Sequence, residues 1–252
     1  MKVNGAAGAN TSTPDTVSLA VPRLGGHQIV VPGSRSSRVT ASAYTRSPVA
    51  DLPIDLDTGL SEQLARVLDV EGKILRALEA LGPVGGRDVV VVDSSAGIRA
   101  RQLTSLGARV TLVPSSARDR YDAPDGSADV VIAFWSAFRD DIDQEVERAA
   151  HVLRPGGRLL VIHDYGRDDV AGLRGALPEH GTWSRRDGPF LGNGFKVRVV
   201  HCWWTFDSME ETRSFLGAAF GDVGRAVAER LTRPRLSYNV AIYHRTLGKE
   251  PA

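Results

Sequence analysis

The chain has 252 residues, of which 42% are hydrophobic and 24% charged, as in a soluble globular protein with a sizeable core. Its 31 basic residues balance 30 acidic ones, so charge gives no case for nucleic acid or an anionic membrane as a partner. No apolar run approaches the ~20 residues of a membrane helix. A single cysteine, Cys202, allows no internal disulfide, and a reducing, cytoplasmic location is the natural expectation.

The N-terminal segment, residues 1–55, is rich in Gly, Ala, Ser, Thr and Pro and holds few large apolar side chains. Such a segment buries too little surface to offset its ordering entropy, so we expect a flexible, mostly disordered arm. The arm is basic, but it lacks interleaved aromatic residues apart from Tyr44, which favours a solvated linker over nucleic-acid contact. We expect one folded domain over 56–247 and a short tail at 248–252.

The folded part begins with helical periodicity from Leu60 to Leu81, ended by glycines and a proline. Four consecutive valines, Val89–Val92, then predict a strand buried on both faces, and a helix is expected from Ile98 to Leu106. The later elements continue this alternation, with strands at 109–113, 128–134 and 158–163 and a helix over 142–153. Strands that alternate with helices predict a parallel sheet with right-handed crossovers.

The C-terminal part has a different pattern. Residues 195–204 and 236–247 are expected to be long strands, with helices at 207–219 and 221–231 between them. Two such strands at the end of a parallel sheet often pair antiparallel at its edge. The sequence therefore predicts an α/β fold, a mostly parallel sheet with helices on both faces and an antiparallel C-terminal edge.

Two turns give the most specific signal. Residues 125–132 read Asp-Gly-Ser-Ala-Asp-Val-Val-Ile, and residues 153–161 read Leu-Arg-Pro-Gly-Gly-Arg-Leu-Leu-Val. In this order and at this separation, they resemble the fourth-strand and fifth-strand turns of the class I S-adenosylmethionine-dependent methyltransferase family. The resemblance covers roughly residues 60–165. It implies a Rossmann-like methyltransferase fold and S-adenosyl-L-methionine as the cofactor.

The cofactor loop departs from the family pattern, in which the first strand ends in an acid and a DxGxGxG loop. Asp93 and Gly97 match that pattern, whereas Ser95 and Arg99 replace the outer glycines. Glycine lets the backbone approach the cofactor closely, and a side chain pushes it back. Serine is the smaller obstacle, and we expect the arginine to point outward from the following helix.

The adenosine side also departs from the pattern. Pro114 stands where the family's second strand ends in an acid that holds the ribose hydroxyls. Only eleven residues, 114–124, separate this strand from the next turn, too few for the helix and strand that the family fits there. Asp119 and Asp122 are candidates for the acid that contacts adenine in the family.

By resemblance, the cofactor contacts are expected on the loop and on two neighbouring strand ends: Asp93, Ser94, Ser95, Ala96, Gly97, Ser115, Phe134 and Trp135. Structural roles compete with these assignments. Asp93 equally suits the N-cap of the following helix. Trp135 suits an aromatic side chain that caps the sheet edge as well as one that stacks on a ligand.

The best acid–base cluster is His163-Asp164-Tyr165, which follows a predicted strand. We expect His163 to deprotonate a substrate hydroxyl or amine, with Asp164 or Tyr165 orienting the reacting group. The competing interpretation is a histidine that hydrogen-bonds locally in a loop.

His201 and Cys202 precede two tryptophans, Trp203 and Trp204. No metal site is expected from them, because zinc needs about four converging ligands. An edge strand explains the pattern more simply, and its tryptophans would wall a substrate pocket or a homodimer interface.

Two functions remain open. The first is methyl transfer from S-adenosylmethionine to an unidentified small molecule. The second is a catalytically inactive relative that serves as a binding or scaffold protein and does not use the cofactor. The intact turns and the His163 cluster favour the first, and the short 114–124 segment favours the second.

Overall fold

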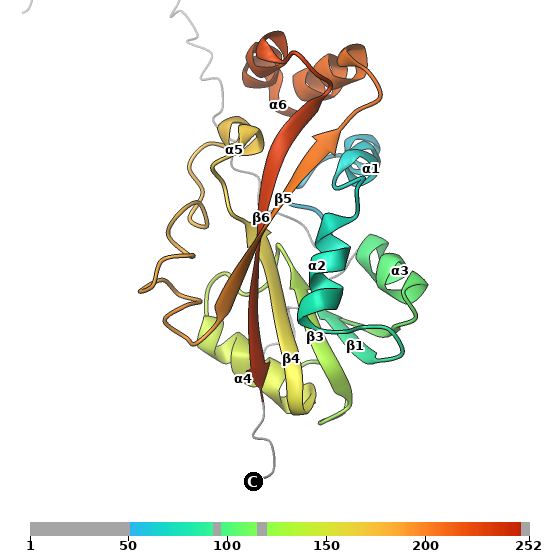
Figure 1. Cartoon of the computed structure of the whole chain (residues 1–252), viewed down its shortest axis with the longest axis vertical. Helices are drawn as coiled ribbons and strands as arrows, with labels where there is room; N and C mark the ends of the chain where they lie inside the picture. Colours follow the sequence, from blue (N-terminus) through green and yellow to red (C-terminus); the bar gives the residue numbers. More distant parts are fainter. Residues whose placement is uncertain (1–50, 93–96, 115–119, 248–252) are drawn as a thin grey trace, which may run out of the picture. The chain divides into compact units, whose positions relative to one another are not determined.

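The computed structural model describes residues 51–92, 97–114 and 120–247. In chain order its elements are α1 Thr58–Val67, α2 Lys73–Leu81, β1 Asp88–Val92, α3 Ile98–Ser105, β2 Arg109–Val113, β3 Ala128–Phe134, α4 Ile142–Val152, β4 Leu153–Asp164, α5 Asp169–Arg174, β5 Lys196–Thr205, α6 Met209–Arg230 and β6 Arg235–Leu247 (Figure 1). None of the helices in these ranges is both long enough and apolar enough to cross a membrane.

The strands form one six-stranded sheet in the order β2-β1-β3-β4-β6-β5. The first four are parallel, whereas β6 pairs antiparallel with β4, and β5 pairs antiparallel with β6. This arrangement confirms the predicted mostly parallel sheet with an antiparallel C-terminal edge. Among the described residues no strand lies outside β2, in agreement with the short segment at 114–124.

Both faces of the sheet are covered, which explains the unbroken valines of β1. Successive side chains of a strand point to opposite faces. Val89 and Val91 join the core cluster that includes buried residues of α1, α2, α3 and α6. Val90 and Val92 join the other cluster, with the buried face of α4 and with Phe190 and Phe195. Each valine is therefore buried, whichever face it occupies.

The predicted single helix over 60–81 is wrong, because two helices occupy this range. Leu68 forms a bridge with Trp204, and the backbone N–H of Asp69 donates to the carbonyl of Trp203 at 3.0 Å. The Asp69 carboxylate then accepts the backbone N–H groups of Lys73 and Ile74 and so caps α2. The pairing of Leu68 with β5 and the Asp69 cap on α2 divide the helix, although the apolar residues continue with helical spacing.

The packed domain includes residues that were expected in the N-terminal arm. Leu52 and Ile54 are 2% and 3% exposed and belong to the core cluster that includes buried residues of α1 and α2. The expected boundary at residue 55 therefore falls inside a packed segment. The rest of the expected arm and the tail lie outside the described residues.

Candidate functional site

The carboxyl ends of β1, β3 and β4 lie at one edge of the sheet, which we call the carboxyl edge. Val92 is in register with Ala133, and Phe134 with Ile162, so the three strands end side by side. Open α/β sheets bind ligands outside the carboxyl ends of their strands. The candidate site is therefore built from the segments that leave β1, β3 and β4.

Gly97 marks the start of α3 at this edge. It adopts a left-handed conformation, φ 66° and ψ 12°, which glycine tolerates and other residues rarely adopt. It is the N-cap of α3 and has no side chain with which to cap the helix. A helix N-terminus of this kind can present backbone N–H groups to a ligand, although here the Asp51 carboxylate accepts the N–H of Arg99. The other expected loop residues, Asp93, Ser94, Ser95 and Ala96, lie outside the described residues, as does Ser115.

Arg99 is buried, so the expectation that it points outward from α3 is wrong. Its side chain is 3% exposed, and its guanidinium lies 5.3 Å from the ring centroid of Trp135. Its Nε donates to the carbonyl oxygen of Asp51 at 3.1 Å, and its backbone N–H donates to the Asp51 carboxylate at 3.4 Å. Burial lowers the pKa of Arg99, while the nearby Asp51 opposes that shift. The segment that holds Asp51 is therefore fastened to the carboxyl edge by Arg99.

Phe134 and Trp135 lie where the sequence places them, at the end of β3, but both are buried. The indole N–H of Trp135 donates to the Asp164 carboxylate and to the Tyr238 hydroxyl, both at 3.1 Å. With Arg99 beside its ring, Trp135 has the geometry of an aromatic side chain that caps the sheet edge.

The His163-Asp164-Tyr165 cluster does not converge. Asp164 is 2% exposed, forms an ion pair with Arg174 and accepts the Tyr238 hydroxyl, so its partners are structural. His163 lies on the opposite face of β4, among the aromatic side chains of the second core cluster. Tyr165 packs against the cluster on the His163 side and is partly buried. Strand alternation therefore separates Asp164 from the His163 imidazole.

His163 itself is completely buried. Trp183 meets its ring edge-on at a centroid distance of 4.8 Å, and Phe190 lies at 5.8 Å. Nδ1 lies 3.4 Å from Nη1 of Arg139, whereas Nε2 has no hydrogen-bond partner among the described residues. Burial and the Arg139 charge lower the pKa of His163 well below its usual value, so the ring is neutral at physiological pH.

The pair Arg139–Glu179 was not predicted from the sequence. Nη2 of Arg139 donates to both oxygens of the Glu179 carboxylate at 2.9 Å, and Glu179 is 1% exposed. Nη1 donates to the carbonyl of Trp135 at 3.0 Å, and the guanidinium lies 5.2 Å from the Trp183 ring centroid. Arg139 follows β3 and Glu179 follows α5. No motif or spacing in the sequence relates the two.

The residues of the other predicted cluster, on β5, also have separate partners. The Cys202 thiol is buried, donates to the carbonyl of Tyr238 at 3.2 Å, and has its pKa raised by burial. His201 is exposed and contacts the Asn239 side chain at 2.7 Å. Trp204 packs in the core against Phe215. Within the described ranges, no group of three or more His, Cys, Asp or Glu residues is placed to hold a metal ion.

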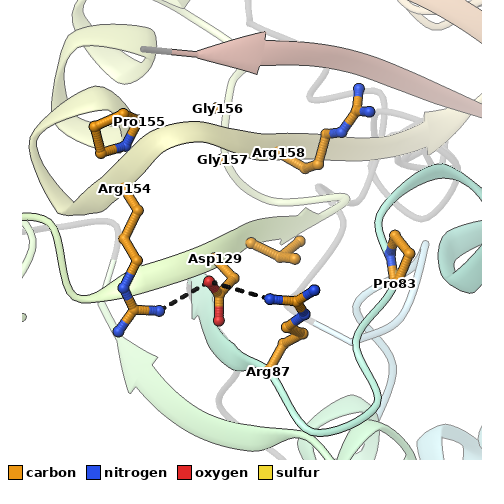
Figure 2. A pocket seen from close by; sticks show the side chains of 9 residues that line it. Pro83, Arg87, Asp129, Arg154, Pro155, Gly156, Gly157 and Arg158 are labelled. Atoms are coloured by element: carbon orange, nitrogen blue, oxygen red, sulfur yellow. Dashed lines mark ion pairs between the residues drawn. The ribbon is translucent and has the colours of Figure 1, made fainter. Parts of the chain in front are cut away.

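A separate pocket of about 260 Å³ lies at the opposite, amino edge of the sheet (Figure 2). Asp129 pairs there with Arg154 at 2.9 Å and with Arg87 at 3.9 Å. Arg154 also pairs with Asp88, whose carboxyl pKa is held at about 2 by hydrogen bonds from Arg109 and Arg154. These ion pairs tie together the starts of β1, β2, β3 and β4, which indicates a structural role for this edge.

Comparison with known proteins finds one matching family of domains. The sequence profile described as a methyltransferase domain matches residues 67–157, less than half of the chain. This range runs from the end of α1 to the Pro-Gly-Gly turn and contains both diagnostic turns. Residues 67–157 therefore match a methyltransferase domain, in agreement with the resemblance of the two turns. No match was found among curated proteins.

Three solved structures illustrate the similarity. A protein assigned as a type II methyltransferase from Anaeromyxobacter dehalogenans is 18% identical, over 70% of this chain and 96% of that one, with a TM-score of 0.48. Haemonchus contortus phosphoethanolamine N-methyltransferase 2, in complex with phosphomonomethylethanolamine and S-adenosylhomocysteine, is 15% identical, over 70% and 52%, with a TM-score of 0.42. A SAM-dependent methyltransferase from Aquifex aeolicus is 14% identical, over 75% and 98%, with a TM-score of 0.39.

The described residues meet the requirements of S-adenosylmethionine in part. At the start of α3, a Cβ at the left-handed Gly97 would meet the Arg101 side chain at 3.5 Å among the described residues, whereas the Asp51 carboxylate accepts the N–H of Arg99. At the end of β2, Pro114 is exposed and offers no carboxylate to ribose hydroxyls. The fit thus depends on the turn after β1.

Proposed function

We propose that the protein is an S-adenosylmethionine-dependent methyltransferase that acts on a small molecule. The observation that carries this proposal is the β1–α3 turn. It follows the central parallel strand of the region that matches a methyltransferase domain, and it leads into α3, whose N-cap is the left-handed Gly97. Backbone N–H groups at such a turn suit the anionic end of the cofactor.

The cofactor, when bound, supplies an electrophilic methyl group. The chain's own contribution is then to bind, to orient and to exclude water, because methyl transfer depends mostly on aligned reactants. Aromatic side chains around His163 exclude water from that side of the carboxyl edge. His163 is neutral, hydrogen-bonds the Ala137 backbone and has no partner at Nε2 among the described residues. In the tautomer with the proton on Nδ1, Nε2 suits a proton acceptor for a hydroxyl or amine nucleophile. Asp164 does not orient that group, because its carboxylate pairs with Arg174 and accepts the Tyr238 hydroxyl.

A second function is favoured by one observation. Asp51 and Arg99 together fill space beside Trp135 and engage the first turn of α3, where a cofactor would otherwise approach. If this arrangement is permanent, the domain is a binding module that does not use S-adenosylmethionine. The two functions differ in a single property, which is affinity for the cofactor.

Isothermal titration calorimetry with S-adenosylhomocysteine tests the proposal on the full chain. We expect saturable 1:1 binding that Gly97→Arg abolishes, because the long side chain enters the turn. Gly86→Arg is the matched control: Gly86 has a similar left-handed φ of 71° but lies in an open turn before β1. Absence of binding by the unmodified chain at millimolar ligand would reject the methyltransferase function. Equal binding by the Gly97→Arg variant would place the ligand elsewhere.

A further inference from the structure

The segment Gly175–Phe195 links α5 to β5 and covers the His163 side of the carboxyl edge (Figure 1). Trp183 and Phe190, both from this segment, lie against the His163 ring. Phe190 also stacks on Tyr243 of β6 at a centroid distance of 3.9 Å. The segment therefore forms an apolar cover over a neutral, buried histidine.

Glu179 is the one acidic residue that this cover buries beside Arg139. The carboxylate takes both of its hydrogen bonds from Nη2 of Arg139, while Nη1 is held by the Trp135 carbonyl. The arginine is thus fixed from the β3 side, and its partner arrives on a separate segment. Glu179 is 1% exposed, whereas the Arg139 side chain is 22% exposed. Burial of a carboxylate seldom adds net stability, even beside an arginine, because the carboxylate loses its hydration. Burial of Glu179 therefore calls for a reason other than stability.

His163 adds an independent observation. Its Nε2 is completely buried and has no hydrogen-bond partner in the described part of the chain. A buried polar atom without a partner costs free energy, and such atoms are uncommon in native proteins. Because Nδ1 of the same ring lies 3.4 Å from Nη1 of Arg139, the unpartnered atom and the guanidinium belong to one small region.

We infer that Arg139 is a carboxylate-binding residue of the methyl-acceptor site, and that Glu179 occupies it while the cover is closed. The acceptor is then a carboxylic acid whose carboxylate replaces that of Glu179 on Arg139. Its hydroxyl or amine donates to Nε2 of His163 in the tautomer that carries the proton on Nδ1, and Trp183 and Phe190 form apolar walls beside it. The identity of this carboxylic acid as the methyl acceptor rests on the proposed function, whereas the binding of a carboxylate by Arg139 does not.

The ends of the cover allow it to move. Gly175 has φ 74° and ψ −163°, a region that essentially only glycine reaches, and Gly194 has a φ of 76°. Residues at the ends of an element that absorb large changes in φ and ψ are typical hinges of closing loops. For a ligand carboxylate to replace the Glu179 carboxylate on Arg139, the segment Gly175–Phe195 has to move away from Arg139.

Chemical rescue of Glu179→Ala tests the inference without knowledge of the natural acceptor. The substitution leaves the partly exposed Arg139 beside a space that propionate matches in size. We expect propionate to raise the Tm of Glu179→Ala in calorimetric scans, whereas the isosteric neutral amide propionamide does not. The rise must disappear in Glu179→Ala/Arg139→Gln. Asp187→Ala, which removes an exposed carboxylate of the same segment paired with Arg185, is the matched control and should show no response to propionate.

No rescue of Glu179→Ala, or equal rescue of the double variant, would overturn the inference. If Glu179→Ala does not fold, Glu179→Gln serves in its place, with amide hydrogen exchange over 175–195 as the readout. Exchange there should rise at least tenfold relative to the unmodified chain and fall again with propionate; unchanged exchange would overturn the inference. S-adenosylhomocysteine binding is measured separately. Binding without rescue rejects this inference alone, and rescue without binding rejects methyl transfer alone.

Discussion

His163 shows how far burial determines the chemistry of one residue in this protein. Its pKa lies well below 6.5 in the folded state because the ring is fully buried and faces Arg139. In the unfolded chain the same ring takes up a proton near pH 6.5. The unfolded state therefore binds more protons below that pH, and the free energy of unfolding falls as the pH falls from 6.5 toward the folded-state pKa.

We predict that His163→Gln flattens this dependence. Each such histidine contributes a slope of at most about 1.4 kcal/mol per pH unit below pH 6.5. Urea unfolding at a series of pH values measures the slope. Some slope will remain, because burial also lowers the pKa values of His180 and His244. His201→Gln, at an exposed histidine, is the control; an equal loss of slope there, or none in His163→Gln, would contradict the burial argument.

For single residues, the sequence predicts a position in the site only where the residue lies at the end of a predicted strand. His163 and Trp135 could be placed at the carboxyl edge because each follows a predicted strand. Arg139 and Glu179 could not be paired, because the long connection after α5 carries Glu179 to Arg139 and no periodic pattern encodes that route. Arg99 was expected to be exposed, because nothing in the sequence indicates that Asp51 folds back over it.

At the scale of elements, caps decide where the N-terminal helices divide. The Asp69 carboxylate accepts the N–H groups of Lys73 at 2.9 Å and Ile74 at 2.7 Å, and it does so from a nearly buried position. Asp57 caps α1 through one bond, to the N–H of Leu60 at 3.0 Å, and is exposed. A cap with two bonds shielded from water stabilises its helix more than a cap with one bond in water.

We predict that Asp69→Ala lowers the free energy of unfolding by about 2 kcal/mol, and that Asp57→Ala lowers it by about 0.5–1 kcal/mol. Asp69→Asn should fall between the unmodified chain and Asp69→Ala, because asparagine tolerates the left-handed φ of 55° and keeps one cap oxygen. Chemical denaturation measures all three. Equal effects of the two alanine variants would show that α2 does not depend on this cap.

The elements themselves were largely predictable, and their ends were less so. Runs of β-branched residues such as Val89–Val92, and the break at Gly221, where α6 leaves helical geometry with φ 59° and ψ −133°, appear where the sequence places them. The division between α1 and α2 was missed because it depends on pairing of Leu68 with Trp204, far along the chain. Local periodicity carries no information about such a contact.

At the scale of the whole molecule, the two edges of the sheet have different chemistry. The amino edge is tied by partly exposed ion pairs among Asp88, Asp129 and their arginines. The carboxyl edge buries more of its charge, with Glu179 paired to the partly exposed Arg139 and with both members of the pair Arg174–Asp164 buried. The mostly parallel sheet with its antiparallel edge followed from strand–helix alternation and from the two diagnostic turns, whereas the order of the strands was not predicted.

The central claim is that the carboxyl edge binds a cofactor at the turn between β1 and α3. Amide hydrogen exchange of the full chain, with and without S-adenosylhomocysteine, tests it most directly. We predict that the ligand slows exchange in peptides that span residues 89–102 and the end of β3, and leaves the amino-edge turn at Arg154–Gly157 unchanged. No change anywhere, or protection confined to the amino edge, would contradict the claim.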